Sequence, residues 1–366
     1  MKLTCTKENL AKGLQVVSHI ASKNITLPIL NNVLLKAHDG ALELSATNLE
    51  LAVISKVRGK VEKEGTFTVQ AKLLTDFITL LPDERIEFDL QEHSLNIHAQ
   101  NSQTVIRGMD ASEFPLIPKV EKKNEYVCNI SDLRSALSQV AIAVSNDESR
   151  PDISGALFSV KGKELTLVGT DSYRLAERVL PLESASDDAD VIVPVKTIFE
   201  LLRIIGDEQG EMTVIMGENQ ILFSFDATKL ISRTIEGRFP DYTQIIPKSH
   251  KTHVTINIEE LSKAIRTASL FCKSGVNDVT IQFIPDKKEV AISALNNQLG
   301  ENTTVLKAKI TCQNNDGVFN YRYLLDGLAN IGTEEVELTI EDNASPGVLR
   351  PAGGKGYLYI IMPIKQ

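Results

Sequence analysis

Hydrophobic residues recur along the chain in a pattern that is repeated three times. Each copy begins with apolar positions spaced i, i+3, i+4, i+7 and i+11, which places one apolar stripe on one face of a helix. These positions are Leu10, Gly13, Leu14, Val17 and Ala21, then Leu133, Ala136, Leu137, Val140 and Val144, and finally Leu261, Ala264, Ile265, Ala268 and Cys272. The sequence therefore predicts three equivalent amphipathic helices.

A second helix is predicted later in each copy. It opens with a basic residue and carries an acid four positions on, and the pairs are Lys72 and Asp76, Lys196 and Glu200, and Arg322 and Asp326. Each helix pattern then meets a helix breaker, which is Pro82, Gly206 or Gly332. Runs of alternating apolar and polar residues before and after these helices predict half-buried strands.

A strand that ends in a polar turn also recurs. Its fullest version is Gly-Thr-Asp-Ser-Tyr-Arg-Leu at 169–175, and weaker copies are Ala-Thr-Asn-Leu-Glu-Leu at 46–51 and Ala-Leu-Asn-Asn at 294–297. The repeating unit is about 120 residues, which is the size of a whole domain. We expect three similar α+β domains at 1–120, 127–247 and 254–366, each with two helices packed on antiparallel sheet.

Composition narrows the class of protein. With 366 residues, 42% of them hydrophobic and 24% charged, the chain is typical of soluble globular proteins. It has no apolar run that would span a membrane and no apolar signal core, so a cytoplasmic location is expected. Four widely spaced cysteines indicate reduced thiols. The net charge of −9 argues mildly against a nucleic-acid partner but does not show where the charges lie.

Three local patterns suggest chemistry, and each has a simpler interpretation. His250 and His253 lack further ligands for a metal. The Gly-Gly-Lys-Gly run at 353–356 lacks the spacing of a phosphate loop and is expected to form a hairpin turn. The acidic run at 187–190 is expected to be a solvated loop. The sequence therefore predicts no metal, no cofactor and no catalytic residue.

Four motifs taken together resemble one known family, the bacterial sliding clamp or DNA polymerase III beta subunit. They are Thr-Leu-Pro-Ile-Leu at 26–30, the 169–175 motif, Arg-Phe-Pro-Asp-Tyr at 238–242 and Met-Pro-Ile-Lys at 362–365. The resemblance runs from Met1 to Gln366. It implies three similar domains per chain and a head-to-tail homodimeric ring around duplex DNA. The implied function is to tether the replicative polymerase, without catalysis.

A ring that slides needs diffuse attraction to phosphates without base-specific contacts. Lys72, Lys196 and Arg322 recur at one helix position, so any charge that they present to the hole is repeated by the symmetry. Further candidates on the first helices are Lys12, Arg134, Lys263 and Arg266. The alternative for any one of them is an ordinary solvated helix end.

The resemblance also implies a cleft between the second and third domains that binds short peptides. The matching positions are Arg150, Ile153, Thr170, Ser172, Tyr173, Arg174, Leu175, Pro240, Gln244, Ile245, Ile360, Met362, Pro363, Ile364 and Lys365. The alternative for each apolar member is plain interdomain core. The implied partners are the polymerase III catalytic subunit, the clamp loader, and other polymerases and repair proteins. Leu270 and Phe271 match positions of the dimer interface.

Two interpretations from other classes compete with the clamp. One is an enzyme with its active site around Asp171, Tyr173 and Arg174, which would need a base or nucleophile partner that the sequence does not supply. The other is an interaction scaffold that never meets DNA. The basic residue matched at three helix starts favours the clamp, because an enzyme has no need of that repetition.

Overall fold

The described residues of the computed structural model form six α-helices and three antiparallel sheets. The structure describes residues 1–21, 26–82, 85–121, 123–273, 275–312 and 314–365; Gln366, the last residue of the expected third domain, lies outside them. The helices are α1 (Lys7–Ser18), α2 (Ala71–Leu80), α3 (Ile130–Ala141), α4 (Val195–Ile205), α5 (Ile258–Ser269) and α6 (Tyr321–Ala329). All six stand where the periodicity predicts them. The final position of each predicted stripe, Ala21, Val144 or Cys272, lies beyond the helix end.

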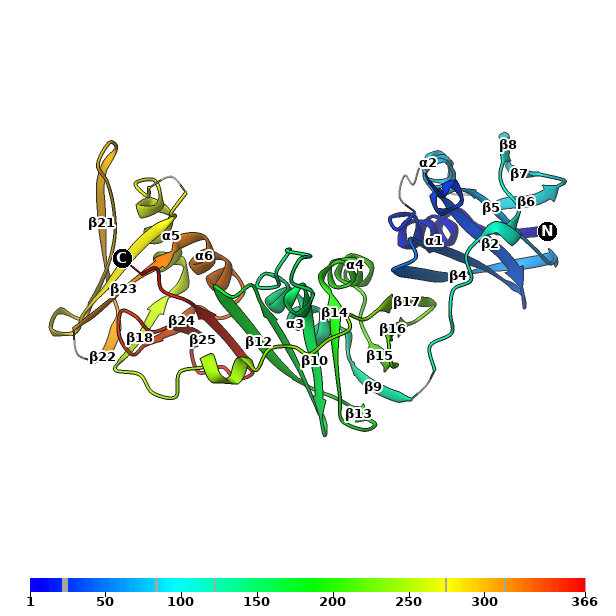
Figure 1. Ribbon diagram of the computed structural model, residues 1–366. Helices are drawn as coiled ribbons and strands as arrows, with labels where there is room; N and C mark the ends of the chain where they lie inside the picture. The colour runs from blue at the N-terminus through cyan, green and yellow to red at the C-terminus, as the bar shows by residue number, and fades with distance from the viewer. Residues whose placement is uncertain (22–25, 83–84, 122, 274, 313, 366) are drawn as a thin grey trace. The chain divides into compact units, whose positions relative to one another are not determined.

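The first compact unit comprises residues 1–130, 183–186 and 203–234. Its sheet contains β1 (Lys2–Thr6), β2 (Asn32–His38), β3 (Ala41–Thr47), β4 (Leu51–Lys63), β5 (Gly65–Gln70), β6 (Arg85–Gln91), β7 (Ser94–Ala99), β8 (Ser102–Arg107), β9 (Asn124–Asn129), β13 (Ser184–Ala185), β15 (Glu211–Met216), β16 (Gln220–Phe225) and β17 (Thr228–Arg233). Helices α1 and α2 lie side by side in this unit (Figure 1). Strand β8 is the last strand of the sheet, with only β7 beside it among the described strands.

The second compact unit comprises residues 131–182, 187–202 and 235–366. Its larger sheet contains β10 (Gly155–Lys161), β11 (Glu164–Thr170), β12 (Arg174–Pro181), β14 (Ala189–Pro194), β18 (Thr252–Asn257), β22 (Lys309–Cys312), β24 (Glu335–Ile340), β25 (Gly347–Pro351) and β26 (Tyr357–Ile361). Its smaller sheet contains β19 (Asp278–Ile284), β20 (Glu289–Asn296), β21 (Gly300–Lys307) and β23 (Asn315–Asn320). Strand β21 forms one edge of this smaller sheet (Figure 1).

Polar side chains at the strand ends start the helices. Thr6 accepts a hydrogen bond from the amide of Asn9 at 3.4 Å, and Asn257 accepts one from the amide of Glu260 at 3.1 Å. Asn320 does the same for the amide of Arg322 at 3.0 Å. Each bond satisfies an amide that has no partner within its helix, so the chain changes from strand to helix at a defined residue.

Successive repeats are joined by strand pairing. At the first joint, β17 pairs with β4 and Ser232 lies opposite Leu51. At the second joint, β26 pairs with β12 and Ile361 lies opposite Arg174. In both cases the last strand of one repeat extends the sheet of the repeat before it. The compact units therefore cut through the central repeat, and the expected domain boundaries stay a prediction.

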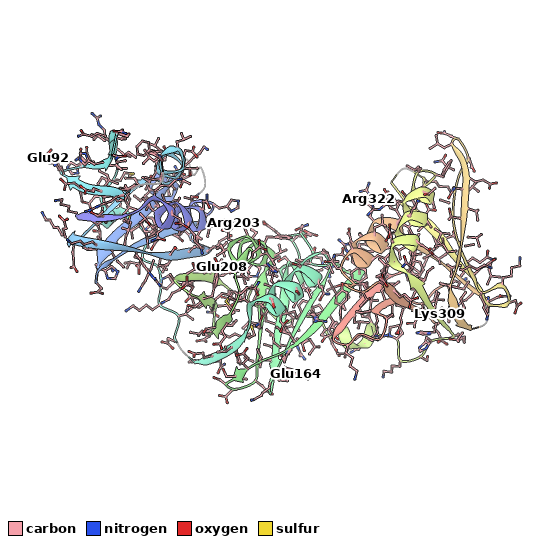
Figure 2. All side chains as sticks on the ribbon, turned by 180° about the vertical axis from the view of Figure 1, so that it is seen from behind. Glu92, Glu164, Arg203, Glu208, Lys309 and Arg322 are labelled. Carbon is pink, nitrogen blue, oxygen red and sulfur yellow. The ribbon has the colours of Figure 1, made fainter. Side chains whose placement is uncertain are left out.

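Helix ends meet at the same two joints. At the first, the Arg203 guanidinium at the end of α4 donates to the carbonyls of Gln15 at 3.0 Å and Val16 at 2.7 Å, near the end of α1 (Figure 2). These carbonyls lie at the negative end of the α1 dipole, where a cation is favoured. At the second, Gln139 of α3 donates to the carbonyl of Asn330, directly after α6, at 2.8 Å. Each joint therefore consists of a strand pair and a pair of helix ends.

We predict that Gly169→Ala destabilises the protein. A Cβ at this position would lie 2.8 Å from the carbonyl oxygen of Val140 and 2.7 Å from a methyl group of Val144, so helix α3 would have to move away from β11. Overpacking of this kind costs about 1–3 kcal/mol in free energy of unfolding. The measurement is thermal and denaturant unfolding, with Lys163→Ala in the exposed hairpin turn before the same strand as control. An unchanged unfolding midpoint would show that the α3 contact is looser than described.

Candidate functional site

The 169–175 motif forms a tight turn between β11 and β12. The Thr170 hydroxyl accepts from the amide of Ser172 at 3.1 Å and donates to the carbonyl of Arg174 at 2.8 Å. The Asp171 carboxylate accepts from the amides of Tyr173 at 2.9 Å and Arg174 at 3.0 Å. Ser172 takes a positive φ of 78°, which is uncommon for a residue other than glycine. The turn leaves the Tyr173 side chain 64% exposed.

Arg174 is held by an internal network. Its Nε donates to Asp171 at 3.0 Å, and its Nη1 donates to Asp326 of α6 at 2.5 Å. The guanidinium also lies 4.4 Å from the centre of the Tyr323 ring, a distance at which a cation–π interaction is favourable. Burial raises the pKa of Tyr359, so its neutral hydroxyl can donate to the carbonyl of Tyr323 at 3.0 Å. Arg174 therefore ties the turn to α6.

A hydrophobic cluster lies beneath this turn. It consists of Val168, Leu175, Ile192, Phe239, Val348, Leu358 and Ile360. Leu175 and Ile360 are fully buried, and Ile153 is 1% exposed. Leu175 and Ile360 therefore belong to the cluster beneath the surface, and none of the three predicted cleft residues offers area to a ligand.

Three large apolar side chains of the predicted set remain at the surface. Tyr173, Ile245 and Met362 are 64%, 40% and 36% exposed. The amide of Met362 donates to the carbonyl of Tyr173 at 2.8 Å, so the segment after β26 is fixed to the turn. At the rim, Arg150 donates to the hydroxyl of Ser172 at 2.8 Å. We call Tyr173, Ile245 and Met362 the Tyr173 surface.

The other predicted members of this site surround the Tyr173 surface. Pro240 precedes Asp241, whose carboxylate accepts from the side chain of Gln244 at 2.8 Å and so fixes the short 3₁₀ turn Tyr242–Ile245. The amide of Ile364 donates to the carbonyl of Val318 at 2.8 Å, which anchors the chain end beside β23. Pro363 is half-buried and Lys365 is exposed.

The predicted DNA-facing residues all lie on helices. Lys12, Lys72, Lys196, Lys263, Arg266 and Arg322 are exposed, and Arg134 is half-buried. Lys72 forms an i,i+4 salt bridge with Asp76 at 3.0 Å, and Lys196 pairs with Glu148 at 2.8 Å. Figure 2 shows Arg322, labelled on α6, and the structure records a cation–π contact with Tyr321. Exposed pairs of this kind contribute little to stability, about 0–1 kcal/mol.

The predicted interface residues lie at the end of α5. Leu270 is 71% exposed, and Phe271 lies 4.0 Å from the position that a Cβ on Gly300 would take at the start of β21. A shallow hollow of about 580 Å³ runs along α5 beside Leu270. These residues and the edge strand β21 therefore form one surface.

The competing chemistry receives no support from the geometry. Asp171 and Arg174 are both engaged in internal bonds within the turn. His253 lies in β18, although the expected domain bounds place it in the segment between the second and third domains, and it is 3.7 Å from Glu337. Among the described residues there is no cluster of three or more His, Cys, Asp or Glu side chains that could hold a metal ion. The 353–356 run forms the predicted turn between β25 and β26.

Cys5 and Cys272 lie in surroundings that favour the neutral thiol. Burial raises the pKa of Cys5 to about 12 and that of Cys272 to about 11, so both thiols stay protonated. Over the described ranges, none of the helices has the length and apolar character needed to cross a bilayer. The acidic run is only partly a loop, because Asp190 lies within β14.

Three family models match the chain in succession. They describe the N-terminal, central and C-terminal domains of the DNA polymerase III beta subunit, and they match residues 1–118, 128–241 and 243–365. The chain belongs to the DNA polymerase III beta subunit family, the bacterial sliding clamps. It is accordingly a DNA sliding clamp and not an enzyme, with DNA and a DNA polymerase as its partners.

Individual relatives agree over their full length. The beta sliding clamps of Synechocystis sp. and Bacillus subtilis are each 27% identical, with 100% of this chain covered and 99% and 100% of the relatives. A crystal structure of the Pseudomonas aeruginosa DnaN sliding clamp bound to griselimycin matches with a TM-score of 0.95 at 28% identity, with both chains fully covered. The Bacillus subtilis clamp structure matches with a TM-score of 0.95 at 26% identity, covering 100% of this chain and 99% of that one.

Sequence reasoning missed the partners of Arg174. Asp326 appeared only as the acid four positions after Arg322, a spacing that Lys72 and Asp76 do use for an ion pair. Asp326 instead reaches Arg174, which is 152 positions away in sequence. No local sequence pattern predicts a contact between residues so far apart in the chain.

We predict that Asp326→Ala lowers the free energy of unfolding by about 1–2 kcal/mol, since it leaves a largely buried guanidinium with one carboxylate in place of two. Asp76→Ala is the matched control, because its pair with Lys72 is exposed on both sides and should matter by less than about 0.5 kcal/mol. Denaturant unfolding of both variants measures the difference. Equal effects would show that the Arg174 network does not stabilise the second unit.

Proposed function

We propose that two copies of the chain close head to tail into a ring that encircles duplex DNA. The observation that carries this proposal is that, among the sheet edges of the described strands, two correspond to the strands paired at the joints but are not paired in that way. The second and third repeats each end in a strand that extends the sheet of the repeat before it, because β17 pairs with β4 and β26 pairs with β12. Only β8, the corresponding strand of the first repeat, and β21, the corresponding acceptor in the third, have no such partner among the described strands.

The helix ends support the same pairing. The end of α4 meets α1 at the first joint and the end of α6 meets α3 at the second. The end of α2 and the end of α5 are left over. Leu80 at the end of α2 is 85% exposed, and Leu270 beside the hollow on α5 is 71% exposed. A third joint between two chains would cover both side chains, which is favourable by about 25 cal/mol for each Å² of apolar surface.

A ring of this kind has a suitable hole. Six described helices per chain give twelve in the dimer. If the helices line the hole at about 10 Å each, the ring of axes is about 120 Å around, which leaves a hole of roughly 28 Å. The exposed basic residues on these helices would then supply phosphate attraction without sequence reading. The acids of the chain would lie chiefly outside.

We further propose that the Tyr173 surface docks short peptides of partner proteins. The partners would be the polymerase III catalytic subunit, the clamp loader, and other polymerases and repair proteins, all in the cytoplasm. Three exposed apolar side chains over a rigid buried cluster suit one or two Leu or Phe anchors. The mobile thioether of Met362 can adapt to different anchors. Because Arg174 is engaged internally, we expect main-chain groups and Arg150 to fix the polar ends.

Charged residues at the proposed dimer contact should produce monomers. We predict that Leu80→Glu, and separately Leu270→Glu with Phe271→Glu, halve the mass measured by sedimentation, because each buries an unpaired charge in the third joint. Phe199→Glu is the control, since this side chain is 53% exposed on α4 and should leave the dimer intact. Dimers that persist in both interface variants would contradict the head-to-tail contact.

Loss of the exposed apolar side chains should weaken peptide docking. We predict that Tyr173→Ala with Met362→Ala reduces the affinity for a fluorescein-labelled pentapeptide with adjacent Leu and Phe by about tenfold or more, as expected for anchor contacts. Phe199→Ala should bind like the unaltered protein. Fluorescence anisotropy measures the affinity and sedimentation checks that the dimer remains. Unchanged affinity in the double variant would place docking elsewhere.

A further inference from the structure

The first joint carries a second copy of the turn found at the Tyr173 surface. The Thr47 hydroxyl accepts from the amide of Leu49 at 3.0 Å and donates to the carbonyl of Leu51 at 2.7 Å. The Asn48 side chain accepts from the amides of Glu50 at 3.0 Å and Leu51 at 2.7 Å. Leu49 has a φ of 77°, against 78° for Ser172. The hydrogen bonds of the 170–174 turn that involve main-chain groups are therefore reproduced at 47–51, whereas the bond between the side chains of Arg174 and Asp171 has no counterpart there.

The neighbouring strand is placed in the same way. The amide of Arg233 donates to the carbonyl of Glu50 at 3.1 Å, as the amide of Met362 does to the carbonyl of Tyr173 at 2.8 Å. Arg233 thus occupies the place of Met362. The segment that carries the Phe-Pro motif is also equivalent, because Phe-Pro at 114–115 corresponds to Phe-Pro at 239–240.

A cavity of about 530 Å³ lies beside the 47–51 turn, and all of its lining residues belong to the first unit. It is lined by residues 47 and 49–52 from the turn, 115–121 and 123 from the segment after β8, 217–220 from the β15–β16 turn, and 231–233 from β17. Leu116 is 97% exposed and Leu49 is 52% exposed at its walls. Two large exposed apolar side chains beside a formed cavity are typical of a binding site.

The strained backbone at Leu49 also supports a binding role for this cavity. A positive φ costs a residue with a Cβ about 1–2 kcal/mol, and a bulky aliphatic residue has no side-chain polar group to offset that cost. Asn, Asp or Gly would fit this position better. The chain instead places a leucine there, half-exposed at the cavity.

The cavity is lined by equal numbers of basic and acidic side chains. Its ionisable lining consists of Arg233, Lys119, Lys123, Glu50, Glu121 and Glu218. Among the described residues, none of these six forms a salt bridge with another. Three acids at one site disfavour a polyanion such as a DNA backbone. A peptide that carries an amine and a carboxylate on either side of an apolar anchor complements both signs.

We propose that this cavity is a second peptide-docking site, which takes an extended segment with one aliphatic anchor and flanking charges of both signs. The anchor would contact Leu49 and Leu116, and a flanking acid would pair with Arg233. The inference rests on the proposed function in one respect, because it takes the equivalent Tyr173 surface as a peptide site. Each chain would then hold two partners at once, with different peptide preferences.

The test uses the full-length protein and two labelled pentapeptides. The first probe, Lys-Ser-Leu-Ser-Glu with a benzophenone group, is aimed at the cavity, and the second carries adjacent Leu and Phe and is aimed at the Tyr173 surface. Leu116→Ser and Arg233→Glu should each weaken the first probe by about tenfold and leave the second unchanged. Photo-crosslinks of the first probe should map to residues 115–121 or 231–233. Tyr173→Ala with Met362→Ala should weaken only the second probe.

Three results would overturn the inference. The first probe could bind with unchanged affinity to Leu116→Ser and Arg233→Glu, or it could crosslink only around Tyr173, which would leave one peptide site and the proposed function intact. A 20-base-pair duplex could compete for the cavity, which would make it a nucleic-acid site. Failure of the second probe to respond to Tyr173→Ala with Met362→Ala would instead count against the proposed function, and it would remove the analogy on which the second site rests.

Discussion

Hydrogen bonding at strand edges is the constraint on which the whole structure depends. A strand at the edge of a sheet presents amides and carbonyls that lack partners, and proteins cover, pair or blunt such edges. Here the second and third repeats each end in a strand that pairs with the repeat before it, so one main-chain interaction both extends a sheet and links two repeats. The pairing needs no particular side chains, which is why three divergent repeats can share it.

The two joints use the same main-chain frame with different side chains. At the second, Arg174 links its turn to α6 through Asp326, and the adjoining strand continues into the apolar Met362. At the first, Leu51 takes the place of Arg174, and the adjoining strand continues into Arg233. At the first joint the end of α1 is capped by a cation from another element, Arg203 at the end of α4. A repeated frame therefore fixes geometry and leaves ligand preference free to differ.

Much of the fold could be predicted from the sequence, because helix periodicity is a local signal. The stripe that contains Leu10, Leu14 and Val17 reports a buried helix face within one segment, and all three are fully buried. The joints could not be predicted in this way, because no sequence pattern near Ser232 indicates that it pairs with Leu51. The exposure of individual site residues could not be predicted from the sequence either. Tyr173 and Leu175 are two positions apart, yet one is exposed and the other is core, because the turn reverses the chain between them.

The equivalence between corresponding strands of the three repeats gives the strand register expected between two chains. Val53, Ala176 and Asn302 are equivalent, since they lie opposite Ala46, Gly169 and Ala294 in their hairpins. Val53 pairs with Leu230, the third residue of β17. The third residue of β8 is Thr104. A closed ring therefore requires Asn302 of one chain to lie opposite Thr104 of the other.

Disulfide trapping at this pair tests ring closure most directly. Residues directly opposed in an antiparallel pair have Cα atoms about 4.5–5.5 Å apart, within the range that a disulfide spans. The account predicts that the variant with both Thr104→Cys and Asn302→Cys oxidises to a dimer crosslinked at both interfaces. The variant with Thr104→Cys and Thr303→Cys, shifted by one position, should crosslink far less. Equal crosslinking of the two variants, or none in the first, would contradict a ring closed through β8 and β21.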